Sequence, residues 1–451
     1  MSLWRRTRRA VARVTGVEAA LQRRLDRERA KHAAEVDRLI VEREYAARQA
    51  RVQSRRAQAA EKEVRQERRR AKGAEKLYRT NRRRANELSA LLRTLDHIPR
   101  YEYGSLLPGD DKWSEKWKSR RGIRILFFAK RDYAGSFYKW AAAINQHSEH
   151  AARLVVTAPH QYGYPIDLLL PNPNLLESDW KTLWREADVL HLKDETGFLN
   201  GSNRLPTEML TGFAGPRVFT QYGGYARKHR EDPEYEAFAK TFDEVVSMTP
   251  DLCFDWLGPE PHYVPHSIDC DVHPFLWSDS PLIGHSPSTR ARKGTEDFLA
   301  AVDVLAQDFN IELDLIEGVS HEEAVHRKRH LGLFFDQAGR ENPDQLGIDS
   351  VIGWYGNSAL EAAVYGVPTI AHLSDDALIG AEKAGVEGIR DIPIVNTPLG
   401  VEGIRSTLHH LLEMTSDERQ SLAIRTRAFV DAFHSQSAVA KRLSALYDGL
   451  G

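Results

Sequence analysis

Short apolar runs alternate with longer amphipathic stretches from about residue 121 onward. Runs of this length between turn-forming residues predict buried strands, and apolar spacings of three and four residues between them predict helices. Strands that alternate with helices predict parallel sheets covered on both faces, an α/β fold. The predicted strands form two series: 123–129, 153–157, 188–192, 217–220 and 244–247, then 282–285, 311–317, 331–335, 367–371 and 392–396.

The two series predict two Rossmann-like, doubly wound domains that face each other across a cleft. The first domain is expected over residues 121–275 and the second over 280–415. Helices are expected over 416–451, where they would pack back on the first domain. Ligands of such sheets bind beyond the carboxyl ends of the strands, so the cleft is the place to look for chemistry.

Residues 1–96 have a different pattern, rich in Arg, Ala, Glu and Leu, and predict a basic helical arm. A segment with Pro, Gly and acidic residues at 97–120 predicts a linker. Apolar residues at three-and-four spacing near both ends of the arm favour a coiled coil there, whereas 53–76 offers little apolar surface. A self-associating homo-oligomer and a solvated single helix both remain open.

Charge separates the arm from the rest of the chain. Residues 1–100 contain 29 Lys and Arg against 13 Asp and Glu, although the whole chain has a net charge of -1. Trp4 lies among arginines, a pattern that fits an anionic membrane surface as well as it fits a frayed basic terminus. Nucleic acid is a less favoured partner, because the arm has few aromatic residues for base stacking.

Cysteine usage and hydropathy bear on the compartment. Cys253 and Cys270 are the only cysteines, so no disulfide framework is predicted. No apolar run approaches the roughly 20 residues needed to cross a bilayer, and the first residues lack a secretory signal. We expect a cytoplasmic protein, with peripheral binding to the inner face of the membrane if the arm contacts lipid.

The segment GWYGNSALEAAVYGVPTI (353–370) carries the first candidate site. Gly356, Asn357 and Ser358 precede or open a predicted helix, where backbone N–H groups can bind an anion such as a diphosphate. Glu361 follows within the helix, where its carboxylate could accept hydrogen bonds from ribose hydroxyls. The alternative is a tight turn that caps an ordinary helix.

A basic loop in the same domain carries the second candidate site. HSPSTRARKGT (285–295) places Arg290, Arg292 and Lys293 between a strand and a helix. A solvated surface turn is the alternative. Together with the helix start at 356–358, these cations would grip a diphosphate from two sides.

These segments resemble the second half of GT-B glycosyltransferases of the family-4 type. YVPHSID (263–269), HSPSTRARKGT (285–295), LDLIEGVSHEEA (313–324) and 353–370 occur in order at fitting distances. The resemblance covers about 121–430 and implies a nucleotide-diphosphate sugar donor, no metal or other cofactor, and usually retained anomeric configuration. It implies that Lys293, with Arg290 or Arg292, faces the donor phosphates. It also implies that backbone 356–358 holds the diphosphate and that Glu361 binds the ribose.

Three positions depart from the family pattern. Gly353 stands where the family has a sugar-binding Glu, Ser288 where it has a phosphate-binding Arg, and Tyr222 where it has a His. A catalytically weakened scaffold that acts through its coiled-coil arm is therefore the alternative to a glycosyltransferase. No catalytic base is assigned.

The first domain supplies candidates for the acceptor side of the cleft, where a glycan or a lipid-linked glycan would bind. Gly135 and Ser136 follow the first predicted strand, and Tyr222 and Gly223 follow a later one. The alternative is that Gly135 serves only to let the chain turn. Lys193 ends another predicted strand and either reaches the cleft or is an exposed loop charge. The Asp pair in DCD (269–271) is interpreted as part of a turn rather than a metal site.

Overall fold

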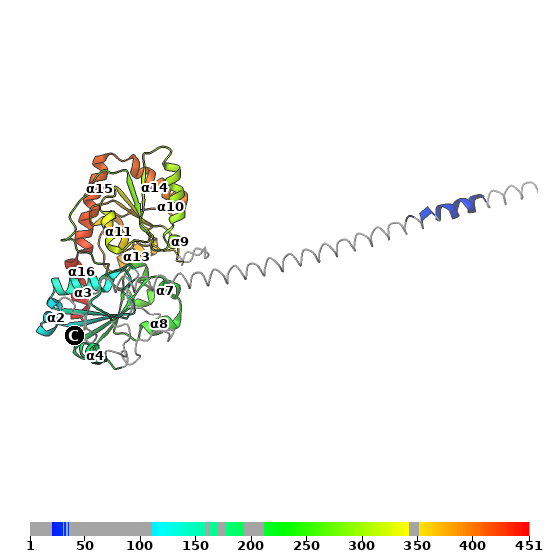
Figure 1. The fold of residues 1–451 in the computed structure, drawn as a ribbon. Coiled ribbons are helices and arrows are strands. Elements are labelled where there is room, and N and C mark those ends of the chain that lie inside the picture. The colour runs from blue at the N-terminus through cyan, green and yellow to red at the C-terminus, as the bar shows by residue number, and fades with distance from the viewer. Residues whose placement is uncertain are drawn as a thin grey trace, which may run out of the picture. The chain divides into compact units, whose positions relative to one another are not determined.

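The structure, a computed structural model, describes residues 20–29, 31–32, 35, 111–157, 160, 162–169, 177–193, 212–341 and 351–450 (Figure 1). The chain divides into two compact units, residues 1–85 and 86–451. In the first unit, residues 20–29 are helical and expose Leu21 and Leu25. The remainder of the predicted arm, most of its coiled-coil seam and Trp4 lie outside the described residues.

The second unit contains two parallel sheets with helices between their strands, which confirms the predicted α/β architecture of two Rossmann-like domains. The first sheet has the order β3-β2-β1-β4-β5-β6-β7. Its strands are β1 (Arg124–Ala129), β2 (Ala151–Val156), β3 (Leu168–Leu169), β4 (Val189–Lys193), β5 (Arg217–Gln221), β6 (Glu244–Ser247) and β7 (His262–Tyr263). β1, β2 and β4 are buried almost throughout, because helices cover both faces.

The helices of the first domain begin before its first strand. They are α2 (Asp111–Ser119), α3 (Ser136–His147), α4 (Glu177–Glu186), α7 (Gly223–Lys228) and α8 (Pro233–Ala239), with short 3-10 turns η1 (Tyr133–Gly135), η2 (Pro250–Leu252) and η3 (Asp255–Leu257). Helix α2 buries Trp113 and Trp117 in two separate apolar clusters of this domain. Residues 111–119 of the predicted linker are therefore part of the domain, whereas 97–110 lie outside the described residues.

The second sheet has the order β12-β11-β10-β8-β9. Its strands are β8 (Leu282–His285), β9 (Glu312–Leu315), β10 (Leu333–Gln337), β11 (Thr369–Ala371) and β12 (Val395–Asn396). The helices around it are α9 (Arg290–Lys293), α10 (Thr295–Leu305), α11 (His321–Lys328), α12 (Asn357–Ala363), α13 (Asp375–Lys383) and α14 (Val401–Glu413), with a 3-10 turn η5 (Ile389–Asp391).

The last helices return to the first domain. α15 (Ser416–Phe429) leads through a π-helical turn η6 (Val430–His434) into α16 (Gln436–Asp448), which packs against α3 (Figure 1). Val439, Leu443 and Tyr447 join the apolar cluster that contains Trp140. Among the described helices, none has the length and apolarity that a membrane span requires.

Strand order locates the site. In the first sheet the chain reverses its direction of growth between β1 and β4, and in the second between β8 and β10. Ligands of open α/β sheets bind outside the carboxyl ends of the strands at such switch points. The residues that follow β1, β4, β8 and β10 are therefore expected to lie at a ligand site.

Candidate functional site

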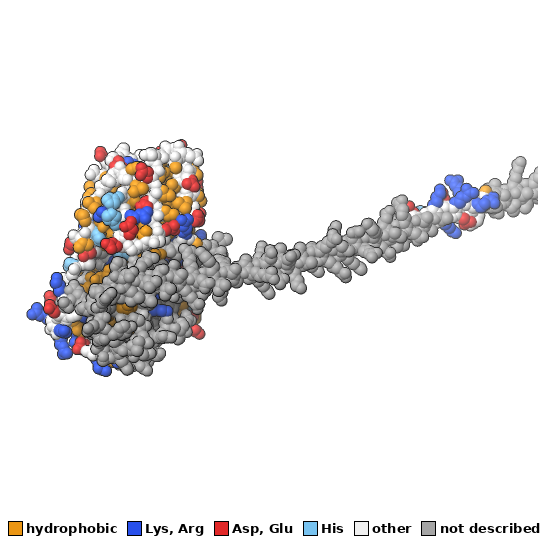
Figure 2. Space-filling view, in the orientation of Figure 1, with side chains coloured by type: hydrophobic (Ala, Val, Ile, Leu, Met, Phe, Trp, Pro, Cys, Tyr) orange, Lys and Arg blue, Asp and Glu red, His pale blue; other side chains and the backbone are white. Residues whose placement is uncertain are grey.

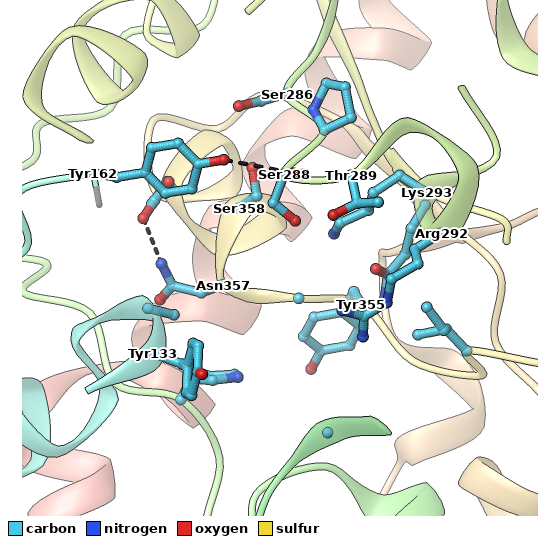
Figure 3. A pocket seen from close by; sticks show the side chains of 18 of the residues that line it. Tyr133, Tyr162, Ser286, Ser288, Thr289, Arg292, Lys293, Tyr355, Asn357 and Ser358 are labelled. Atoms are coloured by element: carbon cyan, nitrogen blue, oxygen red, sulfur yellow. Dashed lines mark hydrogen bonds between the residues drawn. The ribbon is translucent and has the colours of Figure 1, made fainter. Parts of the chain in front are cut away.

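Residues of both domains line one cavity of about 580 Å³ (Figure 3). The loops after β1 and β5 contribute Tyr133 and Tyr222 from the first domain. The second domain contributes Lys293 and Ser358. A cavity of this size is in the range of small-molecule sites and lies where the strand orders place it.

On the second-domain side, a buried carboxylate joins the two predicted halves of the phosphate site. Asp336 at the end of β10 accepts hydrogen bonds from Lys293 Nζ at 2.9 Å and from the backbone amide of Gly356 at 2.6 Å. A Cβ added to Gly356 would lie 3.4 Å from Lys293 Nζ. The basic loop and the start of α12 therefore meet in one place. The amide of Gly356, expected to be available to a ligand, is bonded to Asp336.

The first domain repeats this arrangement at its own switch point. Asp132, which follows β1, accepts hydrogen bonds from the amides of Phe137 and Tyr138 at 3.0 and 2.9 Å. Lys193 at the end of β4 lies 3.1 Å from the same carboxylate. In both domains an Asp at or just after the end of a strand thus pairs with a Lys and accepts hydrogen bonds from amide groups at the start of a helix. Lys193 lines the cavity and is buried in an ion pair, so it reaches the cleft and is not an exposed loop charge.

Glu361 lies at the centre of a buried polar cluster and is 3% exposed. Lys328 Nζ donates to one carboxylate oxygen at 2.6 Å, and His321 Nε2 lies 2.9 Å from the other, which also accepts from Asn357. Burial alone would raise the pKa of Glu361, but the charge of Lys328, the hydrogen bond from His321 and the charge of Lys139 hold it well below its ordinary value. Glu361 is therefore ionised and held in place before any ligand binds.

Another carboxylate, that of Glu341, bridges the two domains at a different edge of the cavity. Glu341 pairs with Arg292 of the basic loop and with Arg227 of the first domain, whose Nη1 lies 2.8 Å away. Arg227 also pairs with Asp251 at 2.5 Å. Gly224 permits this approach, because a Cβ there would lie 2.6 Å from a Glu341 oxygen.

Part of the second-domain side of the cavity is apolar. Ile316, Val319 and Ala324 line it beside the glycine-containing turn at Gly318. Across the cavity, Tyr162 donates a weak 3.5 Å hydrogen bond to the Ser288 carbonyl (Figure 3). Apolar lining next to cationic side chains suits a planar ring joined to an anion.

The structure brings most of the predicted site residues together around the cavity. Those that line it are Arg292, Lys293, Gly356, Asn357, Ser358, Glu361, Tyr222 and Gly223. Arg290 does not line it, since its guanidinium pairs with Glu317 at 2.7 Å and Glu296 at 3.3 Å. Gly135 and Ser136 lie behind the cavity wall, where Ser136 Oγ accepts from Lys193 and Gly135 adopts a left-handed φ of 61°.

Sequence reasoning missed several residues of the site: Asp132, Lys139, His321, Lys328, Asp336 and Glu341. Asp132 and Asp336 could have been found, because each follows or ends a predicted strand at a switch point. Lys328 and His321 lie on α11, and their pairing with Glu361 depends on how α11 packs on α12. No local pattern reports that contact.

Gly353, where the resemblance leads one to expect a carboxylate, has no room for a side chain. A Cβ there would overlap Ser374 Oγ, which caps α13 by accepting from the amide of Ala377. Gly353 does not line the cavity, although Ile352 and Trp354 do. A Glu at this position would therefore require Ser374 and the start of α13 to shift.

No protein-family model matches the chain, and no curated protein sequence does. Several solved structures are similar in fold. An alpha-glucosyltransferase in complex with UDP-glucose and DNA is 12% identical, with a TM-score of 0.45 over 73% of this chain and 99% of that one. The N-terminal domain of Candida albicans trehalose-6-phosphate phosphatase is 10% identical, with a TM-score of 0.48 over 72% and 97%.

A UDP-GlcNAc 2-epimerase from Neisseria meningitidis, bound to UDP-GlcNAc, is 11% identical, with a TM-score of 0.42 over 72% of this chain and 99% of that one. Similarity at this level says nothing about the substrates of the present chain.

Proposed function

We propose that the chain is a GT-B glycosyltransferase that transfers a sugar from a nucleotide-diphosphate sugar to an acceptor. The observation that carries this proposal is the meeting of Lys293 and the 356–358 turn in the interdomain cavity. Arg292 extends the cationic edge, and the apolar lining at Ile316 and Val319 would contact the nucleobase.

Different side chains would act on the diphosphate and on the ribose of the donor. Lys293 and Arg292 would stabilise the negative charge that develops on the leaving diphosphate, the usual electrostatic contribution at such a step. The carboxylate of Glu361 would accept hydrogen bonds from the ribose, and Lys328 and His321 fix its orientation. If the reaction retains configuration, the leaving phosphate can help to orient the acceptor hydroxyl, so no protein base is assigned.

A diphosphate donor would have to compete with Asp336 for Lys293. Its carboxylate already neutralises Lys293 and bonds to Gly356. A diphosphate would have to share Lys293 with Asp336 or displace it; Arg292 is paired as well, with Glu341, but its side chain is 44% exposed against 13% for Lys293. We infer that Arg292 makes the first contact and that Lys293 engages as the donor settles.

The test is ligand-induced stabilisation followed by turnover. UDP, GDP and ADP, and then their sugars, are screened for an increase in Tm, because a ligand that binds the folded state raises it. Lys293→Ala is expected to remove most of the shift, whereas Lys383→Ala, which removes a surface partner of Asp255, should retain it. No shift with any nucleotide would refute the proposal. Release of nucleoside diphosphate from a nucleotide sugar then reports activity.

Gly353 supports a second candidate function, in which the chain is a catalytically weakened scaffold that acts through its N-terminal arm. Glycine at this position leaves the site without the sugar-binding carboxylate of the family, and a side chain there would displace Ser374. This alternative requires nucleotide binding without turnover of any donor, together with self-association of the full chain that is lost when residues 1–85 are removed. Turnover with one donor would exclude it.

The basic arm supports an acceptor at an anionic membrane surface, such as a lipid-linked glycan. Residues 20–29 present Leu21 and Leu25 on a charged helix, and the arginines around Trp4 precede it in sequence. Sedimentation with vesicles of phosphatidylserine and phosphatidylcholine tests this point. Equal recovery in the supernatant with and without anionic lipid would remove it.

A further inference from the structure

The imidazole ring of His434 is buried where the chain passes between the two domains. The face of the second domain shown in Figure 2 mixes acidic, basic and apolar side chains, whereas His434 is 1% exposed. The chain leaves the first domain after β7 and returns to it through η6 and α16. His434 is the last residue of η6, so it belongs to the second of these two connections.

Both ring nitrogens of His434 have a hydrogen-bond partner. Nδ1 lies 2.7 Å from the carbonyl oxygen of His266, in the first connection, and Nε2 lies 2.8 Å from the hydroxyl of Tyr355. Since a carbonyl oxygen can only accept, Nδ1 carries the proton and Nε2 accepts from Tyr355. Burial lowers the pKa of His434 to about 4, which keeps the ring in this neutral form near pH 7. One ring therefore joins both connections to Tyr355 of the second domain.

Tyr355 lines the cavity beside the turn assigned to the diphosphate (Figure 3). We call residues 355–358 the donor turn. Gln337 and Asp336, at the end of β10, bond to the backbone on either side of Tyr355. Those two bonds lie within the second domain and do not depend on how the domains are arranged. The bond from Tyr355 to His434 does depend on it, because His434 lies on a connection between the domains.

Aromatic rings pack around His434 and restrict its movement. The centroid of its ring lies 5.0 Å from that of Phe433, 5.5 Å from that of Phe429 and 5.7 Å from that of Tyr355. The turn η6 is π-helical, a rare form that occurs mostly as single turns and frequently at functional sites. A shift of either connection would therefore be transmitted to Tyr355 rather than absorbed by a change of the His434 side chain.

We propose that His434 is a positioning residue for the donor turn and couples donor affinity to the arrangement of the two connections between the domains. The inference rests on the proposed function and concerns the regulation of the same site. His434 itself does not line the cavity, so it would act on the donor through Tyr355. An arrangement that breaks this bond would bind the donor more weakly, because a less restricted turn loses more conformational entropy on binding.

Two variants of the full-length protein test the positioning role. Tyr355→Phe removes the hydroxyl group alone, and His434→Asn keeps a donor for the His266 carbonyl but removes the nitrogen that accepts from Tyr355. UDP, GDP and ADP are titrated by calorimetry. Each variant should bind the nucleotide that the unmodified protein binds about three- to tenfold more weakly. The double variant should be no weaker than either single variant, because both changes remove the same bond.

Tyr447→Phe is the matched control. It also removes a buried tyrosine hydroxyl bonded to a histidine, here 2.7 Å from Nδ1 of His191, and neither residue lines the cavity. The control should lose about as much stability in urea unfolding as Tyr355→Phe, since each change removes one buried hydrogen bond. It should nevertheless keep the nucleotide affinity of the unmodified protein.

The reciprocal effect tests the coupling. If the donor turn and the connections are linked, a nucleotide bound at the turn must stabilise the connections by the same free energy. The Ile268 amide, which donates to the His434 carbonyl at 2.9 Å, should therefore exchange its hydrogen more slowly when the nucleotide is bound. Mass spectrometry of peptides that contain Ile268 measures this. The slowing should be reduced in Tyr355→Phe and retained in Tyr447→Phe.

The outcomes separate this inference from the proposed function. Failure of the unmodified protein to bind any of the three nucleotides would refute the proposed function, and the donor role of the turn with it. Unchanged nucleotide affinity in a folded Tyr355→Phe variant, or Ile268 exchange that does not respond to the nucleotide, would overturn the role of His434 alone. An equal loss of affinity in Tyr355→Phe and Tyr447→Phe would also overturn it, because affinity would then follow stability.

Discussion

Lys139 Nζ on α3 donates a 2.7 Å hydrogen bond to the side-chain oxygen of Asn357 at the start of α12. One side chain of the first domain therefore reaches the short helix that carries Glu361 in the second. Lys139 also lies 3.8 Å from Glu361, and burial lowers its pKa even though both Glu361 and Asp132 favour its charged form. The two domains are joined at the candidate site itself.

This bond predicts energetic coupling between the domains. A double-mutant cycle of Lys139→Met and Asn357→Ala should give a coupling free energy of about 1 kcal/mol in urea unfolding. A parallel cycle of Lys139→Met with Lys383→Met should be additive, because Lys383 pairs with Asp255 and shares no partner with Lys139. Additivity in the first cycle would show that the bond contributes nothing.

Asp336→Asn tests the competition at the donor site. The substitution keeps an oxygen for the Gly356 amide but removes the negative charge beside Lys293. We expect UDP to bind about three- to tenfold more tightly by isothermal titration, with stability reduced by about 1–3 kcal/mol. Weaker UDP binding would instead mean that the carboxylate positions Lys293 for the ligand.

Glu361→Gln should be strongly destabilising. It leaves Lys328 buried without its ionic partner, a loss of about 3–5 kcal/mol in the free energy of unfolding. Glu402→Gln, which removes an exposed pair with Arg405, should cost less than about 1 kcal/mol. Since the folded pKa of Glu361 lies well below 4.5, its stabilisation is present above that pH and is lost as the pH falls through the folded pKa. A loss below about 1 kcal/mol for Glu361→Gln would contradict the buried pair.

His191 predicts acid sensitivity of the first domain. Its ring lies 2.7 Å from Tyr447 Oη and 2.6 Å from Thr220 Oγ1, and burial, with the charge of Lys193, lowers its pKa to about 3. The unfolded state then binds the proton first, near pH 6.5, so stability falls with pH below that value. Between pH 8 and pH 5 this histidine alone removes about 2 kcal/mol. His191→Gln should reduce the pH dependence of urea unfolding by that amount; an unchanged dependence would refute the assignment.

Gly353→Ala examines the departure from the family pattern. The new methyl group overlaps Ser374 Oγ, so the cap of α13 must shift, and we expect a loss of about 1–3 kcal/mol by urea unfolding. Gly449→Ala is the matched control, because its Cβ meets no atom closer than 3.4 Å. Equal stability of the two variants would show that Ser374 can yield, and that a longer side chain at 353 is tolerated.

Local pattern predicted the sheets well because parallel strands buried on both faces are continuous apolar runs. Each of the ten predicted strands overlaps a strand of the two sheets, and 244–247 and 282–285 match β6 and β8. The two-residue strands β3 and β7 were missed, since a pair such as Leu168–Leu169 has no period to detect. The pattern did not predict helix α2, because Trp113 and Trp117 closely follow Pro, Gly and acidic residues that are typical of a linker.

The site was predicted less completely than the fold. Lys293 and Glu361 follow from their places beside a strand and within a helix, whereas the roles of Asp336 and Lys328 come from tertiary contacts between segments distant in sequence. Arg290 was expected in the site because three cations lie together in sequence. On the short helix α9, however, Arg290 faces Glu317 rather than the cavity. Arg290 and Arg292 are two positions apart, so on a helix their side chains point in different directions, and sequence alone does not say which one faces inward.

The return of α16 to the first domain has a mechanical consequence. The chain crosses between domains twice, and the crossings touch, with the Ile268 amide donating to the His434 carbonyl at 2.9 Å beside the bridge of Ile268 with Ser435. Any opening that admits a substrate must bend both crossings together, so they define a shared hinge axis. A cut or a loop insertion at either crossing would loosen one of the two connections, and the domains would no longer be restricted to rotation about that axis.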